Sequence, residues 1–218
     1  VRTAISVESL TMDYGIPGSP EGHINGVDIE MEKITQKFEH HRDIVFLPNF
    51  KTFDIEQRFV KYEHQEYETK KTFAAVDLGQ QIFSLQGKFT GEDRTLGSLI
   101  QYRKFVAGGF YWTPDTDEIN ISIFGFREKE FNFITVQAST RLEFLTIKPE
   151  TTTLSSVNLD QDQIKERNFY YGSYALSFFR NWQNWKMSSS LMLLQRAPGI
   201  EDMFSDGPHL GSYSYEIG

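Results

Sequence analysis

The fold is decided by residues 80–90, which read Gln80-Gln81-Ile82-Phe83-Ser84-Leu85-Gln86-Gly87-Lys88-Phe89-Thr90. Phe83, Leu85, Gly87 and Phe89 share one parity, and Gln80, Ser84, Gln86 and Lys88 share the other. Side chains two residues apart lie on the same face of a β-strand. This stretch therefore predicts a strand with one apolar face and one polar face.

The same alternation recurs along the chain in about ten segments, separated by stretches rich in Gly, Pro, Asp, Asn and Thr. Helical periodicity is scarce. The predicted strands cover 1–10, 26–37, 51–64, 73–90, 97–106, 119–127, 131–147, 168–180, 184–196 and 212–218. Several reach the length that a tilted membrane strand requires, which is long for a soluble sheet. The sequence predicts an all-β fold, an antiparallel transmembrane β-barrel of which this chain forms a part.

The predicted connections alternate between short and long. Those at 90–94 and 180–184 are brief, whereas 11–25, 64–72, 107–118, 148–167 and 197–211 are extended. Short periplasmic turns and longer outer loops are typical of outer-membrane barrels. One connection, 38–50, falls on the periplasmic side by this count and is nevertheless not short.

Composition agrees with this interpretation. Aromatic residues make up 15% of the chain, yet the mean hydropathy is only −0.43. A ring-rich lipid face combined with a polar lumen gives such values in a membrane barrel. The net charge of −8 and the scattered basic residues exclude the basic stripe of a nucleic-acid-binding protein.

The sequence offers no sign of catalysis. It contains no Gly-x-Ser-x-Gly elbow, phosphate loop, His-Glu-x-x-His or dinucleotide fingerprint, and it contains no cysteine. No stretch is apolar for long enough to form a membrane helix. Both ends, 1–7 and 212–218, read as strands, so we expect 1–218 to be one piece of a barrel domain, truncated at both ends, with targeting information elsewhere.

One block resembles TonB-dependent outer-membrane receptors. It contains Arg196-Ala197-Pro198, Glu201-Asp202-Met203-Phe204-Ser205, Gly207-Pro208-His209 and Tyr215-Glu216-Ile217-Gly218. In that family these elements form a strand, a loop and a strand. Weaker similarities at 14–18, 21–22, 27–32 and 62–66 resemble the zinc-uptake subgroup of these receptors.

The resemblance implies a 22-stranded barrel closed by a plug domain that lies outside this chain. It implies a protein of the bacterial outer membrane that takes up a scarce nutrient and is energised by TonB through the plug. The implied cargo is a metal ion or metal chelate, such as zinc or an iron complex. A ferric siderophore or haem stays open as cargo. The implied partners are outer-membrane lipid, TonB and the transported metal, with no nucleic acid, and no bond is broken, so the protein is not an enzyme.

Five residues are candidate metal ligands because imidazole and carboxylate groups suit divalent transition metals. They are Glu63, His64, Glu66, His23 and His209, all predicted to lie in outer loops. The alternative is that each is an ordinary solvated loop residue. His40 and His41, with Glu39 and Asp43, form a denser cluster, but the strand count places it on the periplasmic side.

Other residues of the resemblance are expected to shape a loop at the barrel rim rather than to select cargo. They are Arg196, Pro198, Glu201, Phe204, Gly207, Pro208, His209, Glu216 and Gly218, with Asp206-Gly207 supplying a turn. A further group fits the aromatic girdles of a membrane interface, although ordinary sheet packing is an equal alternative. Its members are Trp112, Trp182, Trp185, Tyr170, Tyr171 and Tyr213.

A function of a different class stays open. Aromatic strands with polar loops also build soluble all-β carbohydrate-binding or adhesion modules. The two interpretations differ in what covers the apolar strand faces, because a soluble module buries them and a barrel exposes them to lipid.

Overall fold

The computed structural model describes residues 1–18, 24–70, 72–109, 113–150, 158–160, 162–209 and 214–217. Its long strands are β1 (Arg2–Ile16), β2 (Val27–Asp43), β3 (Thr52–Glu68), β4 (Val76–Thr90), β5 (Arg94–Gly109), β6 (Thr116–Phe131), β7 (Ile134–Pro149), β8 (Arg167–Trp182) and β9 (Trp185–Leu193). The short elements are α1 (Ile200–Phe204), β10 (Asp206–His209) and β11 (Ser214–Ile217).

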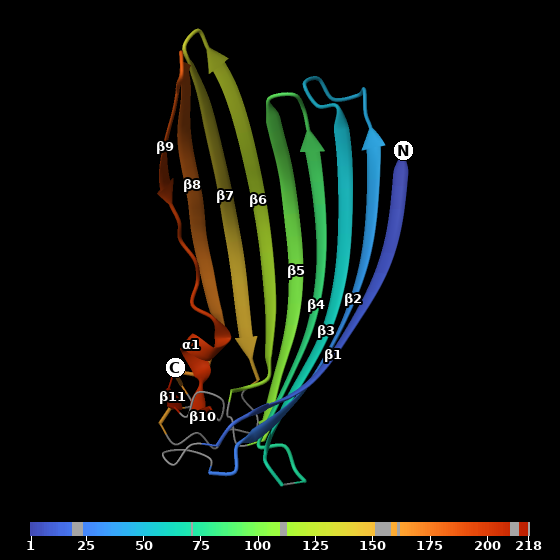
Figure 1. Ribbon diagram of the computed structural model, residues 1–218, viewed down its shortest axis with the longest axis vertical. Helices are drawn as coiled ribbons and strands as arrows, with labels where there is room; N and C mark the ends of the chain where they lie inside the picture. The colour runs from blue at the N-terminus through green and yellow to red at the C-terminus, as the bar shows by residue number, and fades with distance from the viewer. Residues whose placement is uncertain are drawn as a thin grey trace.

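The nine long strands form one sheet in sequence order, and every neighbouring pair is antiparallel (Figure 1). β10 and β11 form a separate two-stranded sheet. The predicted all-β, antiparallel class is confirmed. The nine-stranded sheet is open, with β1 and β9 as its edges.

Successive strands are joined at alternate ends of the sheet. Connections 44–51, 91–93, 132–133 and 183–184 lie at one end, which we call the short-turn end, at the top of Figure 1. Connections 17–26, 69–75, 110–115 and 150–166 lie at the opposite end, which we call the long-loop end. The expected alternation between short and long connections holds in part, because 91–93, 132–133 and 183–184 are brief, whereas 44–51 is longer than 69–75 and 110–115.

The loops predicted at 11–25, 38–50 and 64–72 are shorter than expected because a strand continues into each of them. β1 extends to Ile16. β2 extends to Asp43, so the connection expected at 38–50 shrinks to 44–51. β3 extends to Glu68, through the loop expected at 64–72. At these ends of β2 and β3, charged or polar residues occupy both faces of the strand. The apolar alternation therefore disappears, although backbone pairing with the neighbouring strands continues.

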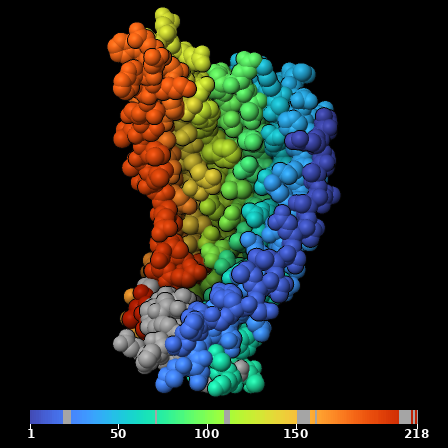
Figure 2. Space-filling view, viewed as in Figure 1, coloured from blue at the N-terminus to red at the C-terminus, as the bar shows by residue number. Residues whose placement is uncertain are grey.

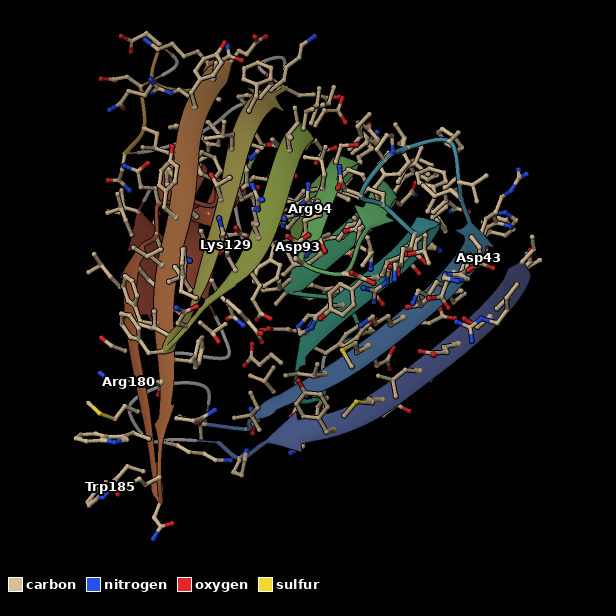
Figure 3. All side chains as sticks on the ribbon, turned by 90° about the horizontal axis from the view of Figure 1, so that it is seen from above. Asp43, Asp93, Arg94, Lys129, Arg180 and Trp185 are labelled. Atoms are coloured by element: carbon tan, nitrogen blue, oxygen red, sulfur yellow. The ribbon has the colours of Figure 1, made fainter. Side chains whose placement is uncertain are left out.

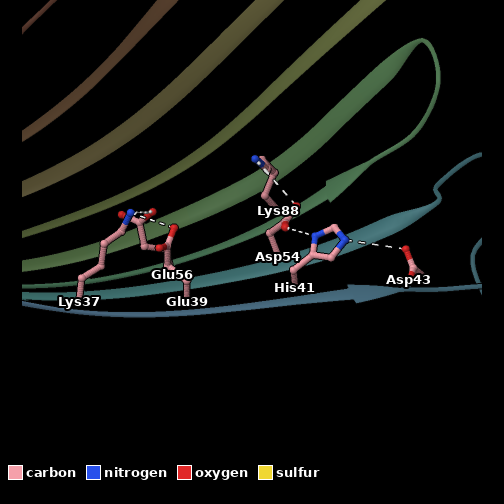
Figure 4. Close-up of polar contacts among 7 residues, drawn as sticks. All are labelled: Lys37, Glu39, His41, Asp43, Asp54, Glu56 and Lys88. Atoms are coloured by element: carbon pink, nitrogen blue, oxygen red, sulfur yellow. Dashed lines mark hydrogen bonds and ion pairs between the residues drawn. The ribbon is translucent and has the colours of Figure 1, made fainter. Parts of the chain in front are cut away.

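The sheet is strongly curved, as the view along the strands shows (Figure 3). Residues paired across strands point to the same face, so the register divides the side chains into a concave and a convex set. Arg180 and Trp185 lie on the outside of the curve in Figure 3. The charged residues drawn in Figure 4 all point to the concave side.

Buried residues gather at the long-loop end of the concave face. Phe105, Leu145 and Ile147 of the sheet pack against Ile200 and Phe204 of α1 in one cluster. A second, smaller cluster contains Val27, Ile29, Ala75 and Val76. β1 and β9 are exposed along nearly their whole length, and the space-filling view shows an open shell between them (Figure 2).

Candidate functional site

The convex face carries an apolar band across the sheet. Large hydrophobic side chains point outward from neighbouring strands and stay exposed. They include Ile5, Val7, Phe83, Leu85, Leu96, Ile100, Ile119, Ile121, Ile123, Leu142, Leu176 and Leu191. Phe53 stacks on its cross-strand partner Phe89 at 4.6 Å, and Phe144 stacks on Tyr170 at 4.8 Å. No described residue covers this face, so its apolar surface is unpartnered in the chain.

Charged residues border the band at a constant spacing. On the convex face of β2, β5 and β6, the bordering pairs are Glu32 and Arg42, Arg94 and Lys104, and Asp117 and Arg127. Each pair lies ten residues apart, with no Asp, Glu, Lys or Arg on that face between them. Ten residues span ~34 Å along a strand. At a tilt of ~40°, this gives a height of ~26 Å, close to the ~25 Å apolar band of outer-membrane barrels.

The two borders carry opposite charge. At the long-loop end the convex face presents Asp13, Asp28, Glu30, Glu32, Glu63, Asp77 and Asp117, with Lys61, Lys104 and Lys148 among them. At the short-turn end it presents Arg42, Arg94, Arg127, Lys129 and Arg180. The outer surface is therefore acidic at one end, apolar in the middle and basic at the other end.

The concave face is polar, and its densest group lies towards the short-turn end on β2, β3 and β4. Lys37 Nζ lies 2.9 Å from Glu39 Oε1 and 3.1 Å from Glu56 Oε2 (Figure 4). His41 Nδ1 lies 2.7 Å from Asp54 Oδ1, which is also near Lys88. We call these six residues the concave charge cluster. Opposite charges alternate across adjacent strands, which suits a wall that faces water.

Further along the concave face, Arg103 links the sheet to α1. Its guanidinium lies 3.6 Å from Glu118 and 3.7 Å from Glu201, over the ring of Phe105. Glu201 belongs to α1 and Glu118 to β6, so the cation bridges the wall and the inserted helix. The helix is thereby held by charge on its exposed side and by Ile200 and Phe204 on its buried side.

A second polar junction holds the block that follows α1. Asp206 accepts hydrogen bonds from the backbone N–H of Asn158 at 2.9 Å, from its side-chain amide at 2.6 Å and from the hydroxyl of Tyr215 at 2.9 Å. The bond to Asp206 raises the pKa of Tyr215, because ionisation of the phenol would place a second negative charge beside the carboxylate. These bonds tie β10 and β11 to the connection before β8.

Of the predicted metal residues, the three in β3 are divided between the two faces of the sheet. Glu63, His64 and Glu66 lie in β3, so their placement in a loop is wrong. His64 Nε2 lies 3.0 Å from Glu66 Oε1, with Tyr62 hydroxyl 3.0 Å from His64 Nδ1, all on the concave face. Glu63 points to the convex face and pairs with Lys61. Within the described ranges, no group of three or more His, Cys, Asp or Glu is arranged to hold a metal ion.

The remaining histidine predictions have separate outcomes. His23 lies outside the described residues, and His209 lies in β10, where the structure describes the backbone but not its side chain. His40 and His41 are in β2 at the short-turn end, on opposite faces. His40 faces outward beside Thr3, and His41 belongs to the concave charge cluster, so the two imidazoles do not share a site.

The stretch that begins at Arg196 folds towards the concave face at the long-loop end. Arg196 and Pro198 precede α1, while Glu201 and Phe204 are part of it, with Phe204 only 1% exposed. Gly207, Pro208 and His209 are in β10 and Glu216 is in β11, so the turn expected at Asp206-Gly207 is wrong. Gly218 lies outside the described residues. The sequence did not predict α1, Arg103 or the concave charge cluster.

The residues predicted for an aromatic girdle have different positions in the structure. Trp182 and Trp185 are cross-strand partners at the short-turn end, and Tyr170 lies on the convex face near the other border. Tyr171 lies on the concave face against the buried cluster, so its assignment to an outer girdle is wrong. Trp112 and Tyr213 lie outside the described residues.

Comparison with known proteins gives no match: no family model fits this chain, and no curated protein resembles it in sequence. Within the described parts of the chain, no helix is long and apolar enough to cross a membrane.

Proposed function

We propose that this chain is part of an outer-membrane β-barrel, with its convex face in lipid and its concave face lining a water-filled lumen. The observation that carries the proposal is the uncharged apolar band, bordered on β2, β5 and β6 by charged pairs at one constant spacing. A strand that crosses a bilayer must keep charged groups out of the hydrocarbon, so two borders at the same separation on several strands are expected.

Backbone pairing supports the same proposal. Each strand from β2 to β8 is hydrogen-bonded on both sides, as a hydrocarbon environment requires. The edges at β1 and β9 need partners in lipid, which further strands of a closed barrel supply. Short turns then lie in the periplasm and long loops outside.

We extend the proposal to a TonB-dependent receptor because the block from Arg196 to His209 resembles that family. The receptor takes up a metal ion or metal chelate, such as zinc or an iron complex, and TonB acts through a plug domain held in the lumen. The polar concave wall suits contact with a plug and with water. Inward folding of α1 at the long-loop rim narrows the entrance that cargo uses.

The absence of cysteine from the chain allows a direct test. Phe83→Cys and Leu85→Cys place a thiol on the convex face of β4, and Ser84→Cys and Gln86→Cys place one on its concave face. In the intact protein in bilayers, a water-soluble maleimide is expected to label the concave pair and spare the convex pair.

A soluble carbohydrate-binding or adhesion module gives the opposite result. Phe83 and Leu85 are each 42% exposed in the chain, so without lipid their cysteines react at least as fast as the concave pair. Equal labelling of all four positions in the membrane preparation contradicts the barrel proposal.

A further inference from the structure

The convex face of β6 to β9 is hollowed where small residues interrupt the apolar band. Gly125, Ala138 and Thr140 on β6 and β7 form the floor of a groove of about 550 Å³. Leu176, Leu191 and Leu193 on β8 and β9 line its wall. The register connects these residues directly, since Gly125 pairs with Thr140, Ala138 with Leu176, and Leu176 with Leu191.

The groove ends in cations. Towards the short-turn end it meets a smaller hollow of about 260 Å³, which shares Arg127 and Ala138 with it and adds Lys129. Arg180 lies on the same face two strands away and two residues nearer the short-turn end than the position level with Lys129, ~12 Å from it. Its guanidinium sits over the rings of Phe133 and Trp182, at 5.5 and 5.4 Å from their centroids.

These cations are only partly neutralised within the described residues. Arg127 lies 3.8 Å from Asp93 and keeps a side chain that is 61% exposed. Lys129 and Arg180 form no ion pair with any described carboxylate. Glu128 and Glu130, on either side of Lys129 in sequence, both point to the concave face, where Glu128 accepts a hydrogen bond from Gln137. The end of the groove therefore has a net positive charge.

We propose that this groove binds one anionic phospholipid, with an acyl chain over Gly125, Ala138 and Thr140 and the phosphate between Arg127, Lys129 and Arg180. The inference rests on the proposed function, because it needs the convex face in lipid. It goes beyond that proposal by assigning an anionic phospholipid to the groove on β6 to β9. The apolar groove matches the acyl chain of such a lipid, and the cations at its end match the phosphate headgroup. A free anion would contact the cations but not the apolar groove.

Two kinds of variant test the two parts of the site. Lys129→Gln with Arg180→Gln removes headgroup charge. Gly125→Leu fills the floor, where an added Cβ meets only Thr95 O at 3.7 Å and Thr140 Cγ2 at 4.0 Å, so the strand has room for it. Gly87→Leu is the matched control: it lies on the same face of β4, its nearest contact is Phe53 at 3.7 Å, and it is remote from the groove.

The intact protein is reconstituted in bilayers of equal phosphatidylglycerol and phosphatidylcholine, extracted in mild detergent, and its retained lipids are counted by native mass spectrometry. We expect retention of one phosphatidylglycerol in preference to phosphatidylcholine. The preference falls by about fivefold for each cation removed. Gly125→Leu abolishes retention, whereas Gly87→Leu leaves it unchanged.

Three results overturn the inference while leaving the barrel proposal intact. The first two are equal retention of both lipids and loss of lipid in the Gly87→Leu control. The third is displacement of phosphatidylglycerol by excess inorganic phosphate, which indicates a simple anion site. A failed barrel proposal is distinguishable, because then no lipid is retained and the convex cysteines of β4 react with the water-soluble maleimide.

Discussion

A positive charge placed in the middle of the convex band tests the membrane geometry quantitatively. The borders on β6 are Asp117 and Arg127, so Ile121 and Ile123 flank the midpoint of the band. Ile121 is 42% exposed on the outer surface. Arg on the lipid face of a barrel costs ~2–4 kcal/mol at the bilayer midplane and ~0–1 kcal/mol near an interface. We expect Ile121→Arg to show the larger cost and Ile119→Arg, next to Asp117, to show a smaller one.

The matched control lies at the same height on the other face. Gln86 is connected through Leu99 to Ser122 by register, and it points into the concave side. Gln86→Arg keeps its charge in water, so its cost is expected to stay within ~1 kcal/mol. The assay is the urea-dependent folding equilibrium of the intact protein in lipid vesicles, followed by tryptophan fluorescence.

The results separate the two environments of the convex face. A cost of ~2–4 kcal/mol corresponds to a ~30- to 700-fold loss in the folding equilibrium constant. In a protein whose convex face meets water, an exposed Ile→Arg change stays within ~0.5 kcal/mol. Equal stabilities for Ile121→Arg and Gln86→Arg therefore refute the assignment of lipid to the convex face.

Three further predictions concern the rim and a turn. Phe204→Ala empties the anchor of α1 and is expected to destabilise the rim by ~3–5 kcal/mol, seen as faster proteolysis after residue 196 with the sheet intact. Asp206→Ala leaves the partners of Asp206 without their acceptor, at a cost of ~1–3 kcal/mol, and is expected to return the pKa of Tyr215 towards its ordinary value in a spectrophotometric titration. In the turn between β4 and β5, the hydrogen bond from Arg94 lowers the pKa of Asp93. This contact therefore stabilises the turn above the ordinary aspartate pKa, and the stabilisation is lost as pH falls through the lowered pKa. Arg94→Gln is expected to raise the pKa of Asp93 in an NMR titration, and an unchanged pKa contradicts the assignment.

Period-two alternation was sufficient to predict the sheet, because each long strand keeps an apolar face over much of its length. It failed at strand ends such as 40–43, where polar residues occupy both faces of the strand. The helix α1 is five residues long, too short for a helical period to be visible in sequence. Its position comes from contacts with β5 and β7, which lie far away in the chain.

The loop placement of Glu63, His64 and Glu66 was wrong because the sequence pattern ended this strand too early. Once β3 is known to continue to Glu68, alternation alone places Glu63 and His64 on opposite faces. His64 and Glu66 then remain as a concave pair, with Glu66 only 3% exposed and its Oε2 without a hydrogen-bond partner. Of the concave charge cluster, the sequence singled out only Glu39 and His41, because Asp54, Glu56 and Lys88 join them through the β2–β3 and β3–β4 registers.

The order of the strands has a consequence for how the sheet is built. Every long strand pairs with its neighbour in sequence, so each new strand adds to an edge that is already present and closes only the connection between two consecutive strands. Assembly therefore proceeds stepwise along the chain without threading, and low sequence separation between contacts favours rapid growth. The growing sheet carries an unpaired edge at each end, as β1 and β9 do here, so the nascent chain needs protection from aggregation while it assembles.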